Sequence, residues 1–388
     1  MSLQSELDQL LSAGVAEGAV PGIVAIVTNA DGAVYAGAFG PRSLGEPAPM
    51  TMDTVGAIAS MSKPITAAAV MQLVEQGRLD LDAPAAAHLP YLGEVQVLTG
   101  FDADGQPLTR PPSRAITMRH LLSHTSGFAY DTWDADLARY RDATGANVVP
   151  TTRAGLRTPL MFDPGERCEY GIGIDWAGLV VEAITGVTLG DYLRAHVFEP
   201  LGMHHTAFRW TTAMASRAIG LHARAADGSL KLLAPREKTS DFDEGGSGLL
   251  GTVPDYARFA GAFLNAGAHP GGRLLAAESV HEMARNQIGD LRVTRMRSTN
   301  ARMSSDAEFM PGIPKTWGLG FQINEAPVPG GRSAGSLSWA GMRNSYFWID
   351  RQRGVSGIVL SQLYPFADAR AVALFERFER ATYANLPL

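Results

Sequence analysis

The stretch that decides the fold is Gly56-Ala57-Ile58-Ala59-Ser60-Met61-Ser62-Lys63-Pro64. An apolar run with helical spacing follows it, from Ile65 to Leu73, so we expect a helix to begin here. Residues three apart share one face of a helix, which places Ser60 and Lys63 side by side in the first turn. Pro64 is compatible with that position, because the amides of a first turn have no intrahelical partner.

This pairing of a serine with a lysine has a chemical consequence. The start of a helix offers free backbone N–H groups and the positive end of its dipole. A serine there could attack a carbonyl carbon, and the amine of Lys63 would help to remove the proton of Ser60. The same four-residue pattern also arises by chance, so partner motifs elsewhere must decide between a catalytic pair and an ordinary helix start.

Composition narrows the class of protein. The 388 residues exceed the usual limit of one hydrophobic core, and 46% hydrophobic with 19% charged residues is typical of an ordinary globular protein. The net charge of −6 gives no electrostatic footprint for nucleic acid or an anionic membrane. Cys168 is the single cysteine, and no Cys/His cluster has metal-ligand spacing, so we expect neither a disulfide nor a metal or other cofactor.

The amino end has neither a basic segment nor an uninterrupted apolar one, and no apolar run in the chain approaches the length of a membrane span. We therefore expect a cytoplasmic, non-membrane protein. The sequence does not determine its oligomeric state.

Expected strands lie near both ends of the chain, and short helices fill the middle. A hairpin is predicted around Asp31-Gly32, and strand runs lie between residues 317 and 363. This arrangement predicts an α/β domain from residues 1–83, 212–252 and 313–388, with helices at both termini. A mainly helical domain would comprise residues 84–211 and 253–312, and Ser60 would lie in the cleft between the two. Residues 128–149 read as a loop that could overhang the site.

Further motifs follow the serine in a recognisable order. They are Ser60-Met61-Ser62-Lys63, His124-Thr125-Ser126-Gly127, Tyr170, Gly245-Gly246-Ser247-Gly248-Leu249, Trp339-Ala340-Gly341 and Phe347-Trp348-Ile349-Asp350. Together they resemble the serine β-lactamase and penicillin-binding-protein superfamily, and within it the family VIII carboxylesterases, which are similar to class C β-lactamases. The resemblance extends from about Val20 to Pro365. It implies a β-lactamase-like fold, with an antiparallel sheet flanked by the terminal helices and a second, all-α domain.

The resemblance also implies roles for individual residues. Ser60 would be the nucleophile, and Tyr170 would share a proton with Lys63 and act as general base and then general acid. The backbone amides of Ser60 and Met342 would form the oxyanion hole, because Gly341 lets the strand edge approach the scissile carbonyl. Around the cleft, the expected substrate contacts are Trp339, Gly341, Phe128, Tyr130 and Trp133.

Two departures from the β-lactamase pattern favour an esterase. The expected Tyr-x-Asn is Tyr170-Gly171-Ile172, which lacks the amide that orients a substrate amide. Trp339-Ala340-Gly341 stands where β-lactamases have Lys-Thr-Gly, so an aromatic wall replaces the cation that would hold a β-lactam carboxylate. Lys315-Thr316-Trp317 imitates the missing motif but lacks its glycine.

A competing nucleophile is Ser333, in Gly331-Arg332-Ser333-Ala334-Gly335. The Gly-x-Ser-x-Gly elbow requires a strand before it and a helix after it. Here a strand-like run follows at residues 337–339, so a hairpin loop is predicted instead.

The expected function is hydrolysis of short-chain, uncharged carboxylic esters through an acyl-enzyme on Ser60. Three alternatives remain open. A transacylase would share the first half-reaction, and a β-lactamase or D-amino-acid peptidase would use the same nucleophile. A non-catalytic relative would be expected to have lost Ser60, Lys63 or Tyr170.

Overall fold

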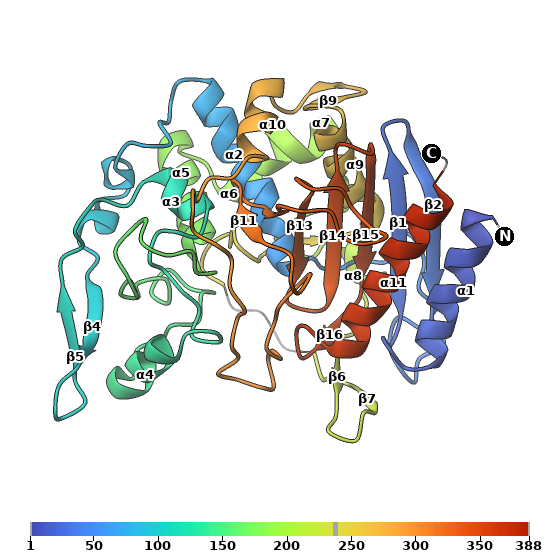
Figure 1. The fold of residues 1–388 in the computed structure, drawn as a ribbon, viewed down its shortest axis with the longest axis horizontal. Helices are drawn as coiled ribbons and strands as arrows, with labels where there is room; N and C mark the ends of the chain where they lie inside the picture. Colours follow the sequence, from blue (N-terminus) through green and yellow to red (C-terminus); the bar gives the residue numbers. More distant parts are fainter. Residues whose placement is uncertain (1, 236–239, 387–388) are drawn as a thin grey trace.

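The computed structural model describes residues 2–235 and 240–386. A seven-stranded antiparallel sheet runs through it in the order β11-β12-β13-β14-β15-β1-β2 (Figure 1). Its strands are β1 (Ile23–Asn29), β2 (Gly32–Phe39), β11 (Lys315–Trp317), β12 (Gln322–Asn324), β13 (Leu337–Gly341), β14 (Ser345–Asp350) and β15 (Val355–Leu360). The amino-terminal hairpin pairs with β15, where Val24 lies opposite Leu360. The expectation of one sheet built from distant parts of the chain is confirmed.

Side chains alternate between the two faces of this sheet, as strand geometry requires. On β14, Trp348 packs on one face beneath α1 (Leu3–Ala16) and α11 (Ala369–Asn385), and Phe347 packs on the other face. Helix α9 (Val253–Leu264) covers that second face, against β1, β14 and β15. The predicted assignment of residues 253–312 to the helical domain is therefore wrong for α9, whose apolar side is buried on the sheet.

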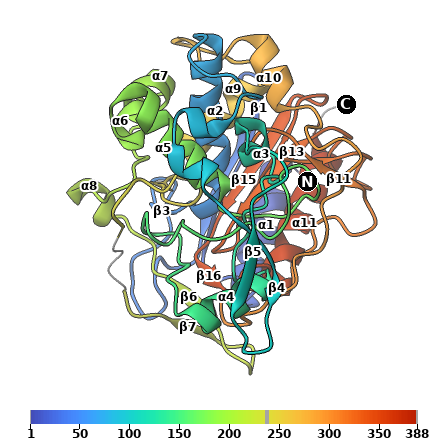
Figure 2. The same cartoon turned by 90° about the vertical axis from the view of Figure 1, so that its left-hand side faces the viewer.

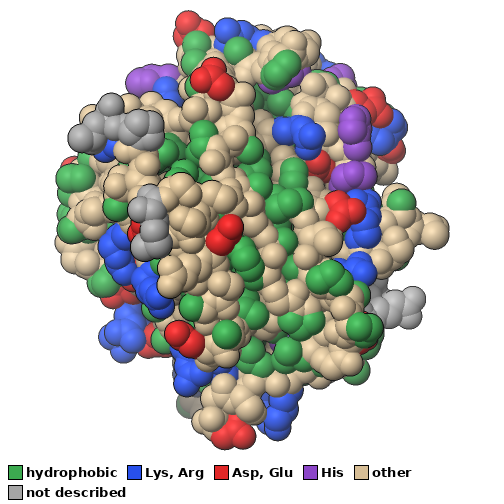
Figure 3. Space-filling model, turned by 90° about the vertical axis from the view of Figure 1, so that its right-hand side faces the viewer, with side chains coloured by type: hydrophobic (Ala, Val, Ile, Leu, Met, Phe, Trp, Pro, Cys, Tyr) green, Lys and Arg blue, Asp and Glu red, His purple; other side chains and the backbone are tan. Residues whose placement is uncertain are grey.

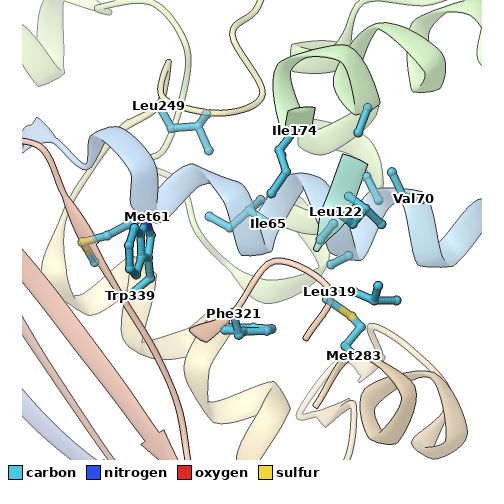
Figure 4. Packing of buried hydrophobic residues seen from close by; sticks show 14 of the residues in the cluster. Met61, Ile65, Val70, Leu122, Ile174, Leu249, Met283, Leu319, Phe321 and Trp339 are labelled. Carbon is cyan, nitrogen blue, oxygen red and sulfur yellow. The ribbon is translucent and has the colours of Figure 1, made fainter. Parts of the chain in front are cut away.

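The helical region is built around α2 (Ser62–Glu75), which contacts α5 (Gly173–Thr185) and α6 (Leu189–Leu193), while α3 (Met118–Leu122) packs on α5. Figure 4 shows α2 between Ile174 and Leu249 on one side and Trp339 and Phe321 on the other. Because both regions pack on it, α2 is buried almost all round, and its first turn lies where they meet. Within residues 2–235 and 240–386, no single helix is long and apolar enough to cross a membrane, and only the bent pair Gly173–Thr185 and Leu189–Leu201 meets that length and composition jointly.

Two predicted segments differ from the structure. Residues 128–149 contain α4 (Ala135–Thr144), because Asp134 caps its first turn by accepting the Leu137 N–H at 2.6 Å. The predicted strand run 317–323 is two strands, β11 and β12, joined by a turn with Gly320 at φ 88°. The other strands are β3 (Gly56–Ala57), β4 (Val97–Phe101), β5 (Pro107–Arg110), β6 (His222–Arg224), β7 (Leu230–Leu232), β8 (Leu250–Gly251), β9 (Ala268–His269), β10 (Gly272–Arg273) and β16 (Leu363–Tyr364). The other helices are α7 (Glu199–Leu201), α8 (Thr212–Ala215), α10 (Ala277–Met283), the 3₁₀ helices η1 (Ala59–Met61), η2 (Ala85–Ala87) and η3 (Pro90–Gly93), and the π-helix η4 (Arg194–Phe198).

A buried ion pair ties the loop before β13 to α11. The Nε of Arg332 donates to Oε1 of Glu379 at 2.8 Å, and the Arg332 backbone N–H donates to the same oxygen at 3.0 Å. Burial alone would raise the pKa of the Glu379 carboxyl, yet the guanidinium beside it holds that pKa below its usual value.

We expect Glu379→Gln to lower the free energy of unfolding by about 3–5 kcal/mol, because it leaves the Arg332 charge buried without its counter-ion. The midpoint of urea unfolding measures the loss. The matched control is Glu376→Gln on the same helix, where the pair with Arg380 is partly exposed and 3.8 Å long. Equal midpoints for the two variants would contradict the expected contribution of the buried Arg332–Glu379 pair to the free energy of unfolding.

Candidate active site

The nucleophile candidate follows a strained turn. The chain leaves β3, and Ala59 adopts φ 48°, a left-handed conformation that is rare for a residue with a side chain. Ser60 then lies in η1, directly before α2. The Ser62 hydroxyl holds the turn, because it donates to the Ala59 carbonyl at 2.6 Å and accepts the Leu249 N–H at 3.2 Å. Packing on both sides of α2 thus fixes the position of Ser60.

The structure brings Ser60 and Lys63 together, as the helical spacing predicts. Lys63 is fully buried, and its Nζ lies 3.3 Å from Ser60 Oγ. The same amine donates to the Tyr130 hydroxyl at 3.0 Å and to the Gly246 carbonyl at 2.8 Å. Three acceptors therefore hold the amine at the serine.

The glycine-rich loop at 245–248 supplies one of these acceptors. The Gly246 N–H donates to Asp175 Oδ1 at 2.8 Å, and Thr66 Oγ1 donates to the Gly245 carbonyl at 2.7 Å. A Cβ on Gly246 would lie 2.4 Å from Asp175 Oδ2, so only glycine allows this approach. These contacts hold the loop so that the Gly246 carbonyl accepts the hydrogen bond from Lys63.

Tyr170 stands beside the lysine, in a different contact from the expected one. Lys63 Nζ lies 4.7 Å from the centre of the Tyr170 ring. The Tyr170 hydroxyl accepts a hydrogen bond from Trp339 Nε1 at 3.2 Å. Tyr170 and Trp339 are thus coupled directly, and Tyr170 meets Lys63 through its ring.

Tyr130 occupies the position that sequence reasoning gave to Tyr170, with its hydroxyl on the lysine amine. Burial raises the pKa of Tyr130 well above its ordinary value, and the nearby Asp175, Tyr170 and Glu244 raise it further. The sequence analysis expected Tyr130 among the substrate contacts. Its contact with Lys63 depends on how residues 124–130 fold back over α2, and no local sequence signal shows this.

The strand end that should complete an oxyanion hole touches the serine turn. A Cβ on Gly341, at the end of β13, would lie 2.5 Å from the Ile58 carbonyl oxygen. The absence of a side chain is what allows this approach. Ser60 lies in the first turn of a helix, where amides lack intrahelical acceptors. Met342 follows Gly341 directly, so both expected amides lie near the Ser60 turn.

A cavity of about 360 Å³ opens beside Tyr170 and Trp339. Trp133, Tyr170, Phe309, Trp317 and Trp339 form its aromatic wall, and we call it the aromatic cavity. Two of the expected substrate contacts, Trp133 and Trp339, line this cavity, whereas Tyr130 and Gly341 lie outside its lining.

The expectation that Phe128 contacts substrate is wrong. Its side chain is only 1% exposed and stacks on Trp176, with ring centres 5.9 Å apart. The backbone at this point is fixed by Gly171, where a Cβ would lie 2.0 Å from the Phe128 carbonyl oxygen. Phe128 is therefore a core residue that supports the loop carrying Tyr130.

Ser333 lies in the connection between β12 and β13, with no helix after it. Its N–H donates to Asp350 Oδ2 at 2.8 Å, and its carbonyl accepts from Asn324 Nδ2 at 2.8 Å. The predicted hairpin loop is confirmed. Lys315 lies on β11, at the edge of the sheet, and its side chain lines the aromatic cavity.

An acidic pair lies beside Tyr170. Burial, a hydrogen bond with Asp134 and the Asp134 charge raise the pKa of the cavity-lining Glu169 to about 8. The folded protein therefore keeps a proton that the unfolded chain releases near pH 4.5. The stabilisation is complete below that pH and is lost as the pH rises towards about 8.

We expect Glu169→Gln to flatten the pH dependence of stability over this interval, because the amide keeps a donor to Asp134 at every pH. Urea unfolding midpoints at about pH 5 and about pH 8 measure it. The exposed neighbour Glu166→Gln is the matched control. The same slope in wild type and Glu169→Gln would disprove the assignment.

The antiparallel sheet, the helical region beside it and a buried lysine on a helix-start serine define a protein of the serine β-lactamase and penicillin-binding-protein fold. The family model described as "Beta-lactamase" matches residues 7–381. The chain belongs to this family, and the family resemblance inferred from the motifs is confirmed.

Individual relatives narrow the kind of chemistry. The chain is 33% identical over 371 residues to a lovastatin esterase of Penicillium rubens, with 91% of each chain covered. It is 30% identical over 389 residues to a monacolin J acid methylbutanoyltransferase of Aspergillus terreus, covering 94% of this chain and 92% of that one. Unliganded simvastatin synthase from Aspergillus terreus, as the selenomethionyl derivative, superposes with a TM-score of 0.86 at 27% identity, over 98% of both chains. The relatives thus include both esterases and acyltransferases.

Proposed function

We propose that this protein is a serine carboxylic ester hydrolase that acts through an acyl-enzyme on Ser60. The observation that carries the proposal is the 3.3 Å contact between Ser60 Oγ and the buried amine of Lys63. A hydroxyl at a helix start, next to a base and beside Tyr170 of the aromatic cavity, has the parts that acyl transfer needs.

In the proposed reaction, Ser60 Oγ bonds to the ester carbonyl carbon while its proton passes to the Lys63 amine. The carbonyl oxygen becomes an oxyanion, and the Ser60 and Met342 amides stabilise it. Collapse breaks the bond to the alcohol, which takes up a proton and leaves. Water then adds to the acyl-enzyme, and its breakdown restores the Ser60 hydroxyl. The aromatic wall supports a small, largely apolar acyl or alcohol group.

We assign the two tyrosines different parts in this reaction. The Tyr170 hydroxyl, held by Trp339 on the cavity wall, would donate its proton to the leaving alcohol, and the Lys63 ammonium, which holds the proton from Ser60, would restore it. Tyr130, whose hydroxyl accepts from Lys63, would keep the amine aimed at the serine.

We expect Tyr170→Phe to lower kcat by roughly 10²–10³-fold, because it removes a proton donor. Tyr130→Phe should cost about tenfold, the usual effect of losing one hydrogen bond to a charged group. Steady-state hydrolysis of an ester with a poor leaving group compares the two variants. A larger loss in Tyr130→Phe would reverse the two roles.

Mass spectrometry of the intact protein tests the acyl-enzyme itself. Brief mixing with 4-nitrophenyl butanoate should add one butanoyl group, and peptide mapping should locate it on Ser60. An adduct on Ser333 or Tyr130 in its place would contradict the proposal.

Transacylation is a second candidate, supported by the methylbutanoyltransferase among the relatives. It would use the same acyl-enzyme, with an alcohol in place of the water. Product analysis in the presence of a secondary alcohol separates the two. Hydrolysis predicts mainly free acid, whereas a transacylase would form mainly the new ester.

A further inference from the structure

Five basic side chains line the aromatic cavity, and Lys315 is the buried one among them. Three come from one segment, as Arg292, Arg295 and Arg297, and two more are Arg167 and Lys315. We call these five residues the cation rim. We propose that the cation rim binds an anionic group on the substrate, so that the ester hydrolysed at Ser60 carries a carboxylate or phosphate. This inference rests on the proposed function and replaces the expectation of an uncharged ester.

The cation rim has few acidic partners. Within the part of the chain that the structure describes, the only ion pair of 4.0 Å or less in the rim is that of Arg295 with Asp306, at 3.0 Å. Arg292 donates to the Leu291 carbonyl at 2.8 Å, and Lys315 to that of Ile313 at 2.8 Å. These carbonyls occupy donors without cancelling charge, so positive charge is left for a ligand.

The acids along the same cavity do not balance the rim. Among the described residues, the acids that line it are Glu169 and Glu308, against five basic residues, and Asp306 pairs with one of the five, Arg295. The proton that Glu169 shares with Asp134 reduces the negative charge further. The whole chain carries a net charge of −6, so the local sign is opposite to that of the molecule. On the side that carries β2, Figure 3 shows basic and acidic side chains interspersed. Charges of one sign around a concave, low-dielectric site attract oppositely charged ligands.

The rim is connected to the chemistry through the cavity itself. The same lining includes Trp339 and Tyr170, and the Tyr170 ring lies 4.7 Å from Lys63 Nζ. Figures 1 and 2 show the long connection between α10 and β11, in orange, beside the sheet edge at β11. Val293 of that connection donates its N–H to the Lys315 carbonyl at 2.9 Å, which anchors the arginines along the strand. An ester with its carbonyl carbon at Ser60 would have to pass Tyr170 and Trp339 to reach the rim, and the proposal requires this path.

Three matched esters test the proposal. They are 4-(butanoyloxy)benzoate, its uncharged benzamide analogue and 4-(butanoyloxy)phenyl phosphate, which share one acyl group and differ in the group presented to the rim. We expect wild type to show a kcat/KM at low salt about tenfold higher for the benzoate than for the benzamide, mainly through KM. The advantage should shrink as salt increases. The faster of the two anionic esters identifies the anion.

The double variant Arg292→Gln/Arg297→Gln should bring the benzoate-to-benzamide ratio close to one. Arg377→Gln, an exposed charge change on α11, should keep the wild-type ratio. A wild-type ratio near one at low salt, or a ratio unaffected by the double variant, would overturn the anion site and leave the esterase intact. If wild type hydrolyses none of the three esters, the result would instead contradict the proposed function, and the anion site with it.

Discussion

Replacing Ser60 with alanine is expected to lower ester hydrolysis by about 10⁴–10⁶-fold, because the acyl-enzyme can no longer form. The effect should fall on kcat, with folding unchanged. Ser60 is partly exposed and is held by the backbone of its turn. Release of 4-nitrophenol and the acyl adduct in the intact-protein mass should be followed on the same samples. The proposal requires that Ser60→Ala abolishes both.

Ser333→Ala is the matched control for this experiment. Ser333 lies in a Gly-x-Ser-x-Gly context, but the structure fixes it through its backbone, by the Asp350 and Asn324 contacts. Its variant should hydrolyse esters at the wild-type rate. Turnover that survives in Ser60→Ala and disappears in Ser333→Ala would refute the acyl-enzyme on Ser60.

The second large effect is expected for Lys63→Met, which keeps the length of the side chain and removes the amine. Acylation should slow by roughly 10³–10⁴-fold, because Lys63 is the one amine within residues 2–235 and 240–386 that contacts the Ser60 hydroxyl. The Tyr130 hydroxyl and the Gly246 carbonyl also lose their donor, so some loss of stability is expected. Rapid mixing with excess enzyme isolates acylation from later steps.

Circular dichroism and the unfolding midpoint separate the chemical effect of Lys63→Met from the structural one. Lys231→Met, on the exposed strand β7, controls for loss of a lysine charge. A folded Lys63→Met protein that acylates near the wild-type rate would exclude the lysine as the base. It would transfer that role to one of the two tyrosines.

Contacts between residues close together in the chain are predictable from the sequence, whereas contacts between distant residues are not. Ser60 and Lys63 are three residues apart, so their spacing predicts that they lie side by side, and the structure places Lys63 Nζ 3.3 Å from Ser60 Oγ. Along β14 both faces are apolar and buried, so alternation separates Phe347 from Trp348 without showing which of them faces α11. The Trp339–Tyr170 contact joins residues that are far apart in the chain. The family resemblance places both residues at the active site, whereas no local sequence pattern does.

Contacts that depend on how loops fold back were not predictable. Phe128 and Tyr130 are two residues apart, yet one is buried against Trp176 and the other contacts Lys63. Helix α4 lies in a polar segment and buries only Leu137, so no apolar periodicity indicates a helix there. The sequence signal for this helix is its N-cap, Asp134. The cation rim escaped notice because single arginines in a segment without helix or strand give no indication of a shared cavity.

The pairing of β1 with β15 sets the order of events when this chain is made. Val24 pairs with Leu360, which is synthesised much later. At a synthesis rate of about 5–20 residues per second, Leu360 emerges from the ribosome roughly 20–70 s after Val24. During that time the amino-terminal hairpin has an open edge, which is a template for wrong pairing. Gly341 likewise arrives long after the Ser60 turn that it completes. We therefore expect nascent chains to depend on chaperones, and truncation before β13 to leave an aggregation-prone fragment.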